Sequence, residues 1–404
     1  MFKNKNVFFT FILLSIVIFL LTFFSGVVND YGLYLKNWNI SNVGANPWVT
    51  EFNGISVRSS SYGPLHTLIG YLALINPLMP KILFGGTSLI VFLLLVSAKN
   101  SVIKNFKKND LFIILLLYPL FPLTIITAYI YGINDSIIAL LVIIACKTRQ
   151  QKKMLITGAV LGLGALLKFY PLLFLTFFSL SSKKGISLKC LLSGITVFCL
   201  GMSFSYFIWG IEILNPLMFG ADRTPKLLSI LKFFNYINDY YSFYIFDYLI
   251  NFLIDKNSVL ILVVVIAIFI HGYMAEIEWE YISIIGTLLI FATYKVGHPQ
   301  FYVSWTVLLA WLITSSVPGS EKNLFAWRLL PIAIYLGIFQ SVYFLSGLID
   351  NGHLRNNWQI IRDLGSVPFL FIILLCLYKN KFFFIKPWKK KRNKFLVINS
   401  LRFP

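Results

Sequence analysis

Long apolar runs separated by short polar segments fill the chain almost from end to end. An α-helix needs about 20 apolar residues to cross a hydrocarbon layer about 30 Å thick, and it satisfies its own backbone hydrogen bonds there. The pattern therefore predicts an all-α integral membrane protein with about twelve transmembrane helices in a single domain, residues 1–404. The runs cover residues 7–28, 80–98, 110–128, 134–147, 154–167, 169–181, 186–209, 257–273, 280–294, 299–316, 325–345 and 365–379.

The first run follows the basic segment MFKNKN and has two interpretations. It is too long for a typical signal-peptide core, and FFSGVV is a poor match to a cleavage site with small residues. We therefore interpret residues 7–28 as an uncleaved first span. Cleavage near Gly26 is the alternative.

The distribution of Lys and Arg predicts the orientation. Charged residues make up only 12% of the chain, yet its net charge is +20. The basic segments recur after every second span, as expected of cytoplasmic loops, so the charge is explained by topology and not by nucleic acid. Both termini, including the basic tail 380–404, are predicted to be cytoplasmic. The tail would also attract anionic membrane lipids. The loops 29–79, 210–256, 295–298 and 346–364 are then extracytoplasmic.

Two of these outer loops carry apolar segments of their own. Residues 64–78 are short for a span and are bounded by prolines, which favours an interfacial or re-entrant helix in the first outer loop, 29–79. The loop 210–256 is rich in Tyr and Phe, which is typical of a helix in the headgroup layer. The same rings would also suit stacking on sugar faces.

Four polar groups stand at the ends of spans on the predicted outer side. Each has a structural interpretation: a residue wetted by headgroup water, a helix N-cap, a snorkelling lysine or a hydrogen-bonded histidine. Their convergence on one side from distant parts of the chain favours a functional site instead. The groups are Asp30, the pair Asn134 and Asp135, Lys168 near Tyr170, and Lys295 with His298 and Gln300.

The segments around these residues resemble the GT-C superfamily of polytopic glycosyltransferases. The resemblance covers about residues 7–316. It is closest to mannosyltransferases of the type that adds the first mannose in GPI-anchor synthesis, and to bacterial mannosyltransferases that use polyprenyl-phosphate mannose. The matching segments, in order, are NDYGLYLKNWNISNVGANPW, SYGPLHTLIGYLALINPL, YGIND, GLGALLKFYPLLFL and KVGHPQFYVSW.

The resemblance implies transfer of a hexose, with mannose favoured, from a polyprenyl-phosphate donor to a lipid-linked or glycan acceptor. Asp30 is then the general base, because a fixed carboxylate accepts the proton of the attacking hydroxyl. The developing phosphate charge needs cations, for which Lys168, Lys295 and His298 are the candidates. The remaining residues of the matching segments are expected to bind substrate: Tyr31, Tyr62, Asn134, Asp135, Tyr170 and Gln300.

The sequence departs from the family in one respect. Many GT-C loops carry two acids, whereas Val28-Asn29-Asp30 keeps one. A single carboxylate is a poor site for a hard dication, so no metal site is predicted, although a divalent cation stays open. One carboxylate acting as base also favours inversion of the anomeric centre over double displacement.

Two other classes compete with a transferase. A lipid-linked polysaccharide polymerase or flippase would also be polytopic and basic, but a polymerase typically uses Arg-rich outer loops and a flippase needs a polar path through its spans. A secondary transporter would show two related halves and broken helices at the midplane. The Lys, Asn, Ile and Phe content indicates a low-GC genome and hence a bacterial inner membrane. The sugar and the acceptor are not specified.

Overall fold

The chain is helical throughout most of the residues that the computed structural model describes. These residues are 5–28, 30–57, 59–102, 118, 121–181, 185–216, 223–241, 244–348 and 364–380. Their first half contains the helices α1 (Lys5–Phe24), α2 (Asp30–Asn42), α3 (Pro64–Gly70), α4 (Met79–Val102), α6 (Pro122–Thr124), α7 (Asp135–Gln150), α8 (Met154–Ala165) and α9 (Pro171–Ser179). The second half contains α10 (Leu188–Trp209), α12 (Ile230–Tyr241), α13 (Tyr244–Asp255), α14 (Asn257–Met274), α15 (Trp279–Thr293), α16 (Tyr302–Ser315), α17 (Glu321–Leu348) and α19 (Ser366–Lys379).

Short helical turns and two-residue strands connect these helices. The turns are η1 (Tyr71–Leu74), the π-helical η2 (Ile125–Ile130), η3 (Ile211–Leu214) and η4 (Pro299–Phe301). The antiparallel pairs are β1 (Glu51–Phe52) with β2 (Ile55–Ser56), and β3 (Leu180–Ser181) with β4 (Gly185–Ile186). In contrast, β5 (Lys226–Leu227) pairs in parallel with β6 (Val296–Gly297).

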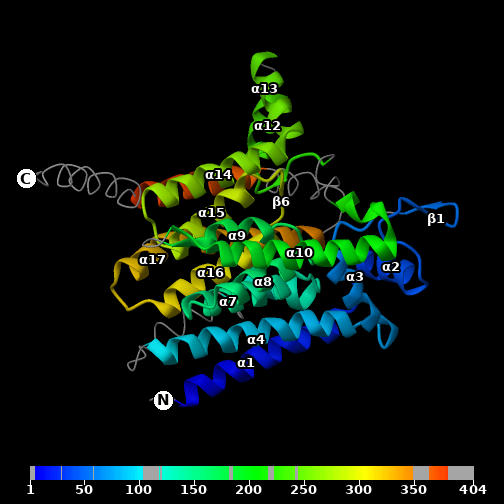
Figure 1. Ribbon diagram of the computed structural model, residues 1–404, viewed down its shortest axis with the longest axis horizontal. Helices are drawn as coiled ribbons and strands as arrows, with labels where there is room; N and C mark the ends of the chain where they lie inside the picture. The colour runs from blue at the N-terminus through cyan, green and yellow to red at the C-terminus, as the bar shows by residue number, and fades with distance from the viewer. Residues whose placement is uncertain are drawn as a thin grey trace, which may run out of the picture.

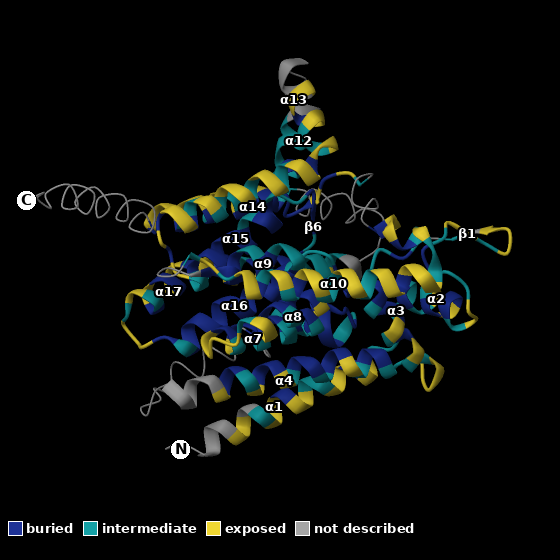
Figure 2. Cartoon of the chain, in the orientation of Figure 1, coloured by how far each residue is buried: buried dark blue, intermediate teal, exposed yellow. Residues whose placement is uncertain are grey.

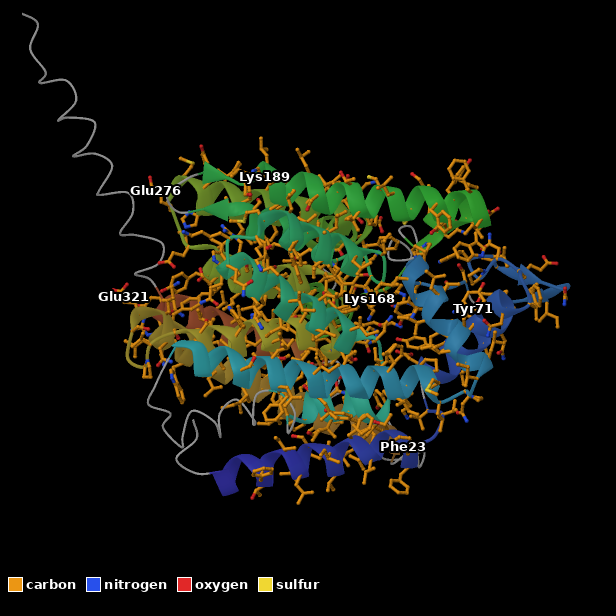
Figure 3. All side chains as sticks on the ribbon, turned by 60° about the horizontal axis from the view of Figure 1, so that its bottom comes forward. Phe23, Tyr71, Lys168, Lys189, Glu276 and Glu321 are labelled. Carbon is orange, nitrogen blue, oxygen red and sulfur yellow. The ribbon has the colours of Figure 1, made fainter. Side chains whose placement is uncertain are left out.

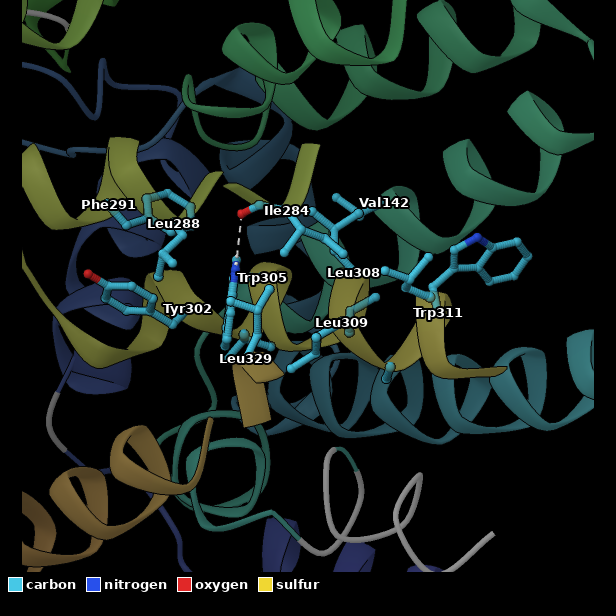
Figure 4. Close-up of a cluster of buried hydrophobic side chains, with 14 of the residues drawn as sticks. Val142, Ile284, Leu288, Phe291, Tyr302, Trp305, Leu308, Leu309, Trp311 and Leu329 are labelled. Carbon is cyan, nitrogen blue, oxygen red and sulfur yellow. Dashed lines mark hydrogen bonds between the residues drawn. The ribbon is translucent and has the colours of Figure 1, made fainter. Parts of the chain in front are cut away.

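The core of the bundle surrounds α16. Every residue of this helix from Tyr302 to Thr314 is buried, as expected of a helix that is apolar on all sides. Its Trp305 indole donates to the carbonyl of Ile284 in α15 at 3.1 Å, and α7 and α17 cover its other faces (Figure 4). Figure 2 shows the same gradient, from buried α16, α15 and α7 to the exposed outer faces of α14, α10 and α1.

Glycines allow α8 and α10 to pack backbone against backbone. A Cβ added to Gly158 would lie 2.0 Å from the carbonyl oxygen of Cys190, and one added to Gly162 would lie 2.3 Å from that of Gly194. Small residues spaced by four along a helix permit this close approach in membrane proteins. The packing of α8 against α10 therefore holds the C-terminal end of α8, and Lys168 follows shortly after that end.

Several helices have the length and composition to cross a membrane. Among the described residues α4, α10, α14 and α17 do so, and a fifth span results if α6 and η2 form one broken span with α7 across a bend of 119°. The exposed faces of α10 and α14 carry large apolar side chains such as Leu200, Phe207 and Val263, which suit contact with lipid. The structure thus supports an all-α membrane protein.

The predicted count of twelve spans is not confirmed. Eleven of the twelve apolar runs contain a helix of at least nine residues, but α8, α9 and α16 have only 12, 9 and 14 residues. At a rise of 1.5 Å per residue they are about 14–21 Å long, which is short of the hydrocarbon thickness. Much of the run 110–128 lies outside the described residues.

The helices run side by side, so their connections gather at two opposite ends (Figure 1). Lys189, Glu276 and Glu321 lie toward one end in Figure 3, and Phe23 and Tyr71 lie at the other. The predicted first outer loop, with α2, α3 and the β1–β2 hairpin, is at the second end. The predicted basic tail lies outside the described residues from position 381 onward.

The aromatic loop 210–256 forms two helices that leave the bundle. In Figure 1, α12 and α13 project from the N-terminal end of α14, roughly across the direction of the long helices. This orientation suits the predicted location in a headgroup layer, which stays a prediction. The predicted short helix at 64–78 is found as α3 followed by η1.

Candidate active site

One cavity of about 920 Å³ opens among the loops at the end of the bundle that holds α2 and α3. Its walls come from five separated parts of the chain: α2 and the segment after it, the ends of α8 and α9, the segment around β5, the start of α14, and the α15–α16 connection. Six of the ten residues proposed from the sequence line it: Asp30, Tyr62, Lys168, Tyr170, His298 and Gln300.

Asp30 is the first residue of α2 and is half-buried at the cavity wall. An acid is favourable there because it interacts with the free N–H groups at the start of a helix. One face of α2 buries Tyr31, Tyr34 and Trp38 against the bundle. The packing of this aromatic face holds α2 in place, and with it the carboxylate of Asp30. Asp30 is the only carboxylate among the described residues that line the cavity.

Lys168 is held by a buried ion pair. Its Nζ lies 2.5 Å from Oδ2 of Asp135, and the two side chains are 6% and 0% exposed. The Tyr170 hydroxyl donates to the other carboxylate oxygen at 3.0 Å. The ammonium also lies 5.2 Å from the ring centre of Tyr62 and 5.4 Å from that of Phe301. Lys168 lines the cavity, and its charge is balanced by Asp135, which does not line it.

A buried aromatic layer supports Tyr62. The Tyr34 hydroxyl donates to the Tyr62 hydroxyl at 3.0 Å, and the His66 ring packs on both phenol rings. Burial raises the pKa of Tyr34 and of Tyr62 well above that of a free phenol, so both hydroxyls keep their protons. The segment approaches α8 closely because Gly63 has no Cβ: an added one would lie 2.3 Å from the carbonyl oxygen of Leu166.

The parallel pair of β5 and β6 brings a second set of polar groups to the cavity. The Lys226 N–H donates to the carbonyl of Lys295 at 2.9 Å, and Leu228 donates to that of Gly297 at 3.1 Å. Only glycine fits at position 297, since a Cβ would lie 2.2 Å from the Ser229 nitrogen. His298 and Gln300 follow β6 directly, so this pairing carries Lys226 to the same wall.

Four of the proposed residues do not line the cavity. The Tyr31 hydroxyl donates to the carbonyl of Pro77, which ties α2 to the start of α4. The amide nitrogen of Asn134 donates to Nδ1 of the buried His66 at 3.0 Å, and Asp135 lies behind Lys168. The Lys295 ammonium is buried and donates to the carbonyl of Ile254 at 3.3 Å. Their side chains thus bind groups inside the protein, and their predicted contact with substrate stays a prediction.

Three cations in the cavity wall were not proposed from the sequence. Lys36 lies on α2, while Arg223 and Lys226 lie in the segment around β5. Among the described lining residues, basic side chains outnumber carboxylates. No pattern marked these three cations, because β5 has two residues and isolated basic residues are common in outer loops.

Another part of the cavity lining is apolar. Leu172, Leu173, Ile261, Ile290 and Phe291, from α9, α14 and α15, form an apolar wall beside the charged groups. Apolar pockets that hold a few convergent polar groups are typical ligand sites. This one combines a carboxylate, an excess of positive charge and an apolar surface, which suits an amphipathic anion.

No cluster of three His, Cys, Asp or Glu side chains that would hold a metal ion occurs in the described part of the chain. In comparisons with known proteins, no family model matches this sequence and no curated protein matches it. The functional interpretation therefore depends on the geometry of the cavity and on the chemistry of its residues.

Proposed function

We propose that the protein is a membrane glycosyltransferase of the GT-C type. It would transfer a hexose, with mannose as the first candidate, from a polyprenyl-phosphate donor to a lipid-linked or glycan acceptor on the extracytoplasmic side. The observation that supports this most is that Asp30, Lys168 and His298, from three distant segments, line one cavity. The proposal includes about twelve spans with cytoplasmic termini in a bacterial inner membrane, as the Lys and Arg distribution indicates.

In the proposed reaction Asp30 is the general base. The acceptor hydroxyl would donate a hydrogen bond to its carboxylate and attack the anomeric carbon of the donor. As the new C–O bond forms, the proton moves to Asp30 and the bond from the anomeric carbon to the phosphate oxygen breaks. Because no second carboxylate is found among the described lining residues to act as nucleophile, we propose a single displacement with inversion.

The phosphate leaves with the bonding electron pair and needs positive charge beside it. Lys168 was the first candidate from the sequence, but its charge is already balanced by Asp135. The β5–β6 pairing gathers Arg223, Lys226 and His298 at one wall, and we assign the leaving phosphate to these residues on the basis of that location. Lys168 would contribute as a hydrogen-bond donor at the cavity floor. The positive wall lowers the energy of the charge that develops in the transition state.

The apolar wall would hold the first units of the prenyl chain. Leu172 and Leu173 on α9 face the cavity together with Ile261 on α14, one of the helices with a lipid-suited outer surface. A chain leaving this wall would continue into the bilayer beside α14. A donor that is anionic at its head and apolar beyond it matches both surfaces.

The proposal is tested by supplying purified protein in nanodiscs with polyprenyl phosphates that carry different labelled hexoses. A transferase consumes one of them and forms a new covalent glycoside whose anomeric configuration is inverted. A polymerase would instead form a ladder from oligosaccharides linked to a lipid diphosphate, and a flippase or transporter would move label across a vesicle membrane without changing it. Either of these outcomes, or retention of configuration, would contradict the proposed reaction.

A further inference from the structure

Lys36 is a cation of the cavity wall that the proposed donor does not need. It lies on the exposed side of α2, and it takes part in none of the ion pairs found between described residues. The cations assigned to the donor phosphate lie around β5, which is hydrogen-bonded to β6. Figure 1 shows α2 and β6 apart, so Lys36 and Lys226 reach the cavity from different elements.

The position of Lys36 relative to Asp30 is fixed by the helix they share. Lys36 follows Asp30 by six positions, which corresponds to about 9 Å along the axis and about 120° around it, at 1.5 Å and about 100° per residue. Both line the cavity. A molecule whose hydroxyl contacts Asp30 therefore reaches Lys36 with a group about one to two sugar rings away.

The cavity wall near these two charges also carries neutral polar groups that suit a glycan. Asn37 lies on the same face of α2 as Asp30, seven residues on, and Ser61 lines the cavity from the segment after β2. Amide and hydroxyl groups pair with sugar hydroxyls. Leu33 and Ile40 of α2 also line the cavity, but the donor is already assigned to the β5 cations and to the apolar side chains of α9, α14 and α15. We therefore assign the surface along α2 to the acceptor.

Resting on the proposed function, we propose that Lys36 is part of an acceptor subsite for an anionic group. The acceptor would carry a phosphate or a carboxylate about one to two sugar units from the hydroxyl that is glycosylated. Its hydroxyl binds at Asp30 and its negative charge binds the Lys36 ammonium, while Asn37 and Ser61 offer hydrogen bonds to its sugar hydroxyls. The positive excess of the cavity is then shared by two anions, the donor phosphate and this group.

The test compares three soluble acceptors that share one glycan: a neutral glycoside, the same glycan with a phosphate, and the same glycan with a uronic carboxylate. Transfer is measured in nanodiscs of neutral lipid, so that lipid charge does not contribute. We expect the KM of at least one anionic acceptor to be about tenfold lower than that of the neutral one, as for a single charge-assisted contact. The acceptor with the lower KM identifies the anionic group. Added salt should reduce the difference.

Variants assign the effect to Lys36. Lys36→Gln should abolish the tenfold preference by raising the KM of the anionic acceptor, whereas Lys36→Arg should keep it. Lys189→Gln, which removes an exposed lysine near the opposite end of the bundle, is the matched control and should keep the preference. Lys226→Gln should raise the KM of the donor and leave the acceptor preference intact.

Two failures are distinguishable. Transfer with equal KM values for neutral and anionic acceptors overturns the subsite and leaves the transferase standing. A preference that survives in Lys36→Gln also overturns it, as does a Lys36 effect seen only in anionic lipid, which would indicate a membrane contact. No transfer to any acceptor, the neutral one included, overturns the proposed function itself and the subsite with it.

Discussion

Replacing Asp135 by Asn tests the buried ion pair between Asp135 and Lys168. The substitution keeps an oxygen that accepts from the Tyr170 hydroxyl and changes the volume very little. It removes the charge that lies 2.5 Å from the Lys168 ammonium. A buried cation is then left without its counter-ion.

The structure gives the expected magnitude. Removing one partner of a buried ion pair costs about 3–5 kcal/mol, because the remaining charge is uncompensated. Lys168 is 6% exposed and reaches the cavity wall, so its ammonium is able to turn toward solvent in part. We therefore expect the lower end, a loss of about 3 kcal/mol in the free energy of unfolding. In the double variant Asp135→Asn, Lys168→Met no charge is left buried, and most of this loss should be recovered.

The free energy of unfolding is measured by titration with SDS in mixed micelles for the wild type, both single variants and the double variant. The control is Glu280→Gln. Glu280 pairs with Lys322 at 2.9 Å, but Lys322 is 31% exposed, so the expected loss is only about 1 kcal/mol. The reasoning is refuted if Asp135→Asn is as stable as the wild type, or if it is less stable and adding Lys168→Met brings no recovery.

Three further predictions concern packing, the β5–β6 connection and pH. Gly158→Ala should destabilise the protein by about 1–3 kcal/mol, because its methyl group meets the α10 backbone, whereas Gly86→Ala, in open space, should not; thermal unfolding of both variants decides this. Gly297→Ala should raise the KM of the donor severalfold by separating β5 from β6, and an unchanged donor KM would contradict the assigned phosphate site. Because folding raises the pKa of Tyr62, the unfolded chain loses its proton first above about pH 10, so stability should fall with rising pH there. Tyr62→Phe should make that fall shallower in melting temperatures measured from pH 9 to 11.

The helical class and the approximate positions of the helices could be predicted because apolar runs are a long-range signal. Residues 64–78 illustrate this: prolines at both ends predicted a short separate helix, and α3 with η1 occupies that segment. The number of spans is harder, because a bilayer crossing depends on how short helices such as α8 and α9 tilt and pack. The apolar pattern alone does not contain that information.

The candidate site could be predicted in part for a related reason. Asp30, Lys168 and His298 stand at the ends of apolar runs, so their cost near a membrane draws attention to them, and all three line the cavity. The partner of Lys168 is Asp135, which was expected to bind substrate. Pairing of this kind depends on tertiary contacts between segments 33 residues apart, to which local patterns are blind.

The cations missed from the sequence have a different explanation. Arg223 and Lys226 are brought to the cavity by a parallel pair of two-residue strands, which is too short for an alternating pattern. Gly297 is a sequence signal of this contact, but an isolated glycine is common for other reasons. Lys36 lies on a helix whose buried face is aromatic, and its role depends on the cavity that other segments complete.

The most direct measurement is the rate of hexose transfer by Asp30→Asn at saturating donor and acceptor. Removing a general base is expected to lower kcat about 10²- to 10⁴-fold, while binding of the donor is retained. Glu51→Gln, which neutralises an exposed acid in the β1–β2 hairpin at the same end of the protein, should transfer hexose at the wild-type rate. A kcat of Asp30→Asn equal to that of the wild type would remove Asp30 from the reaction and contradict the proposed mechanism.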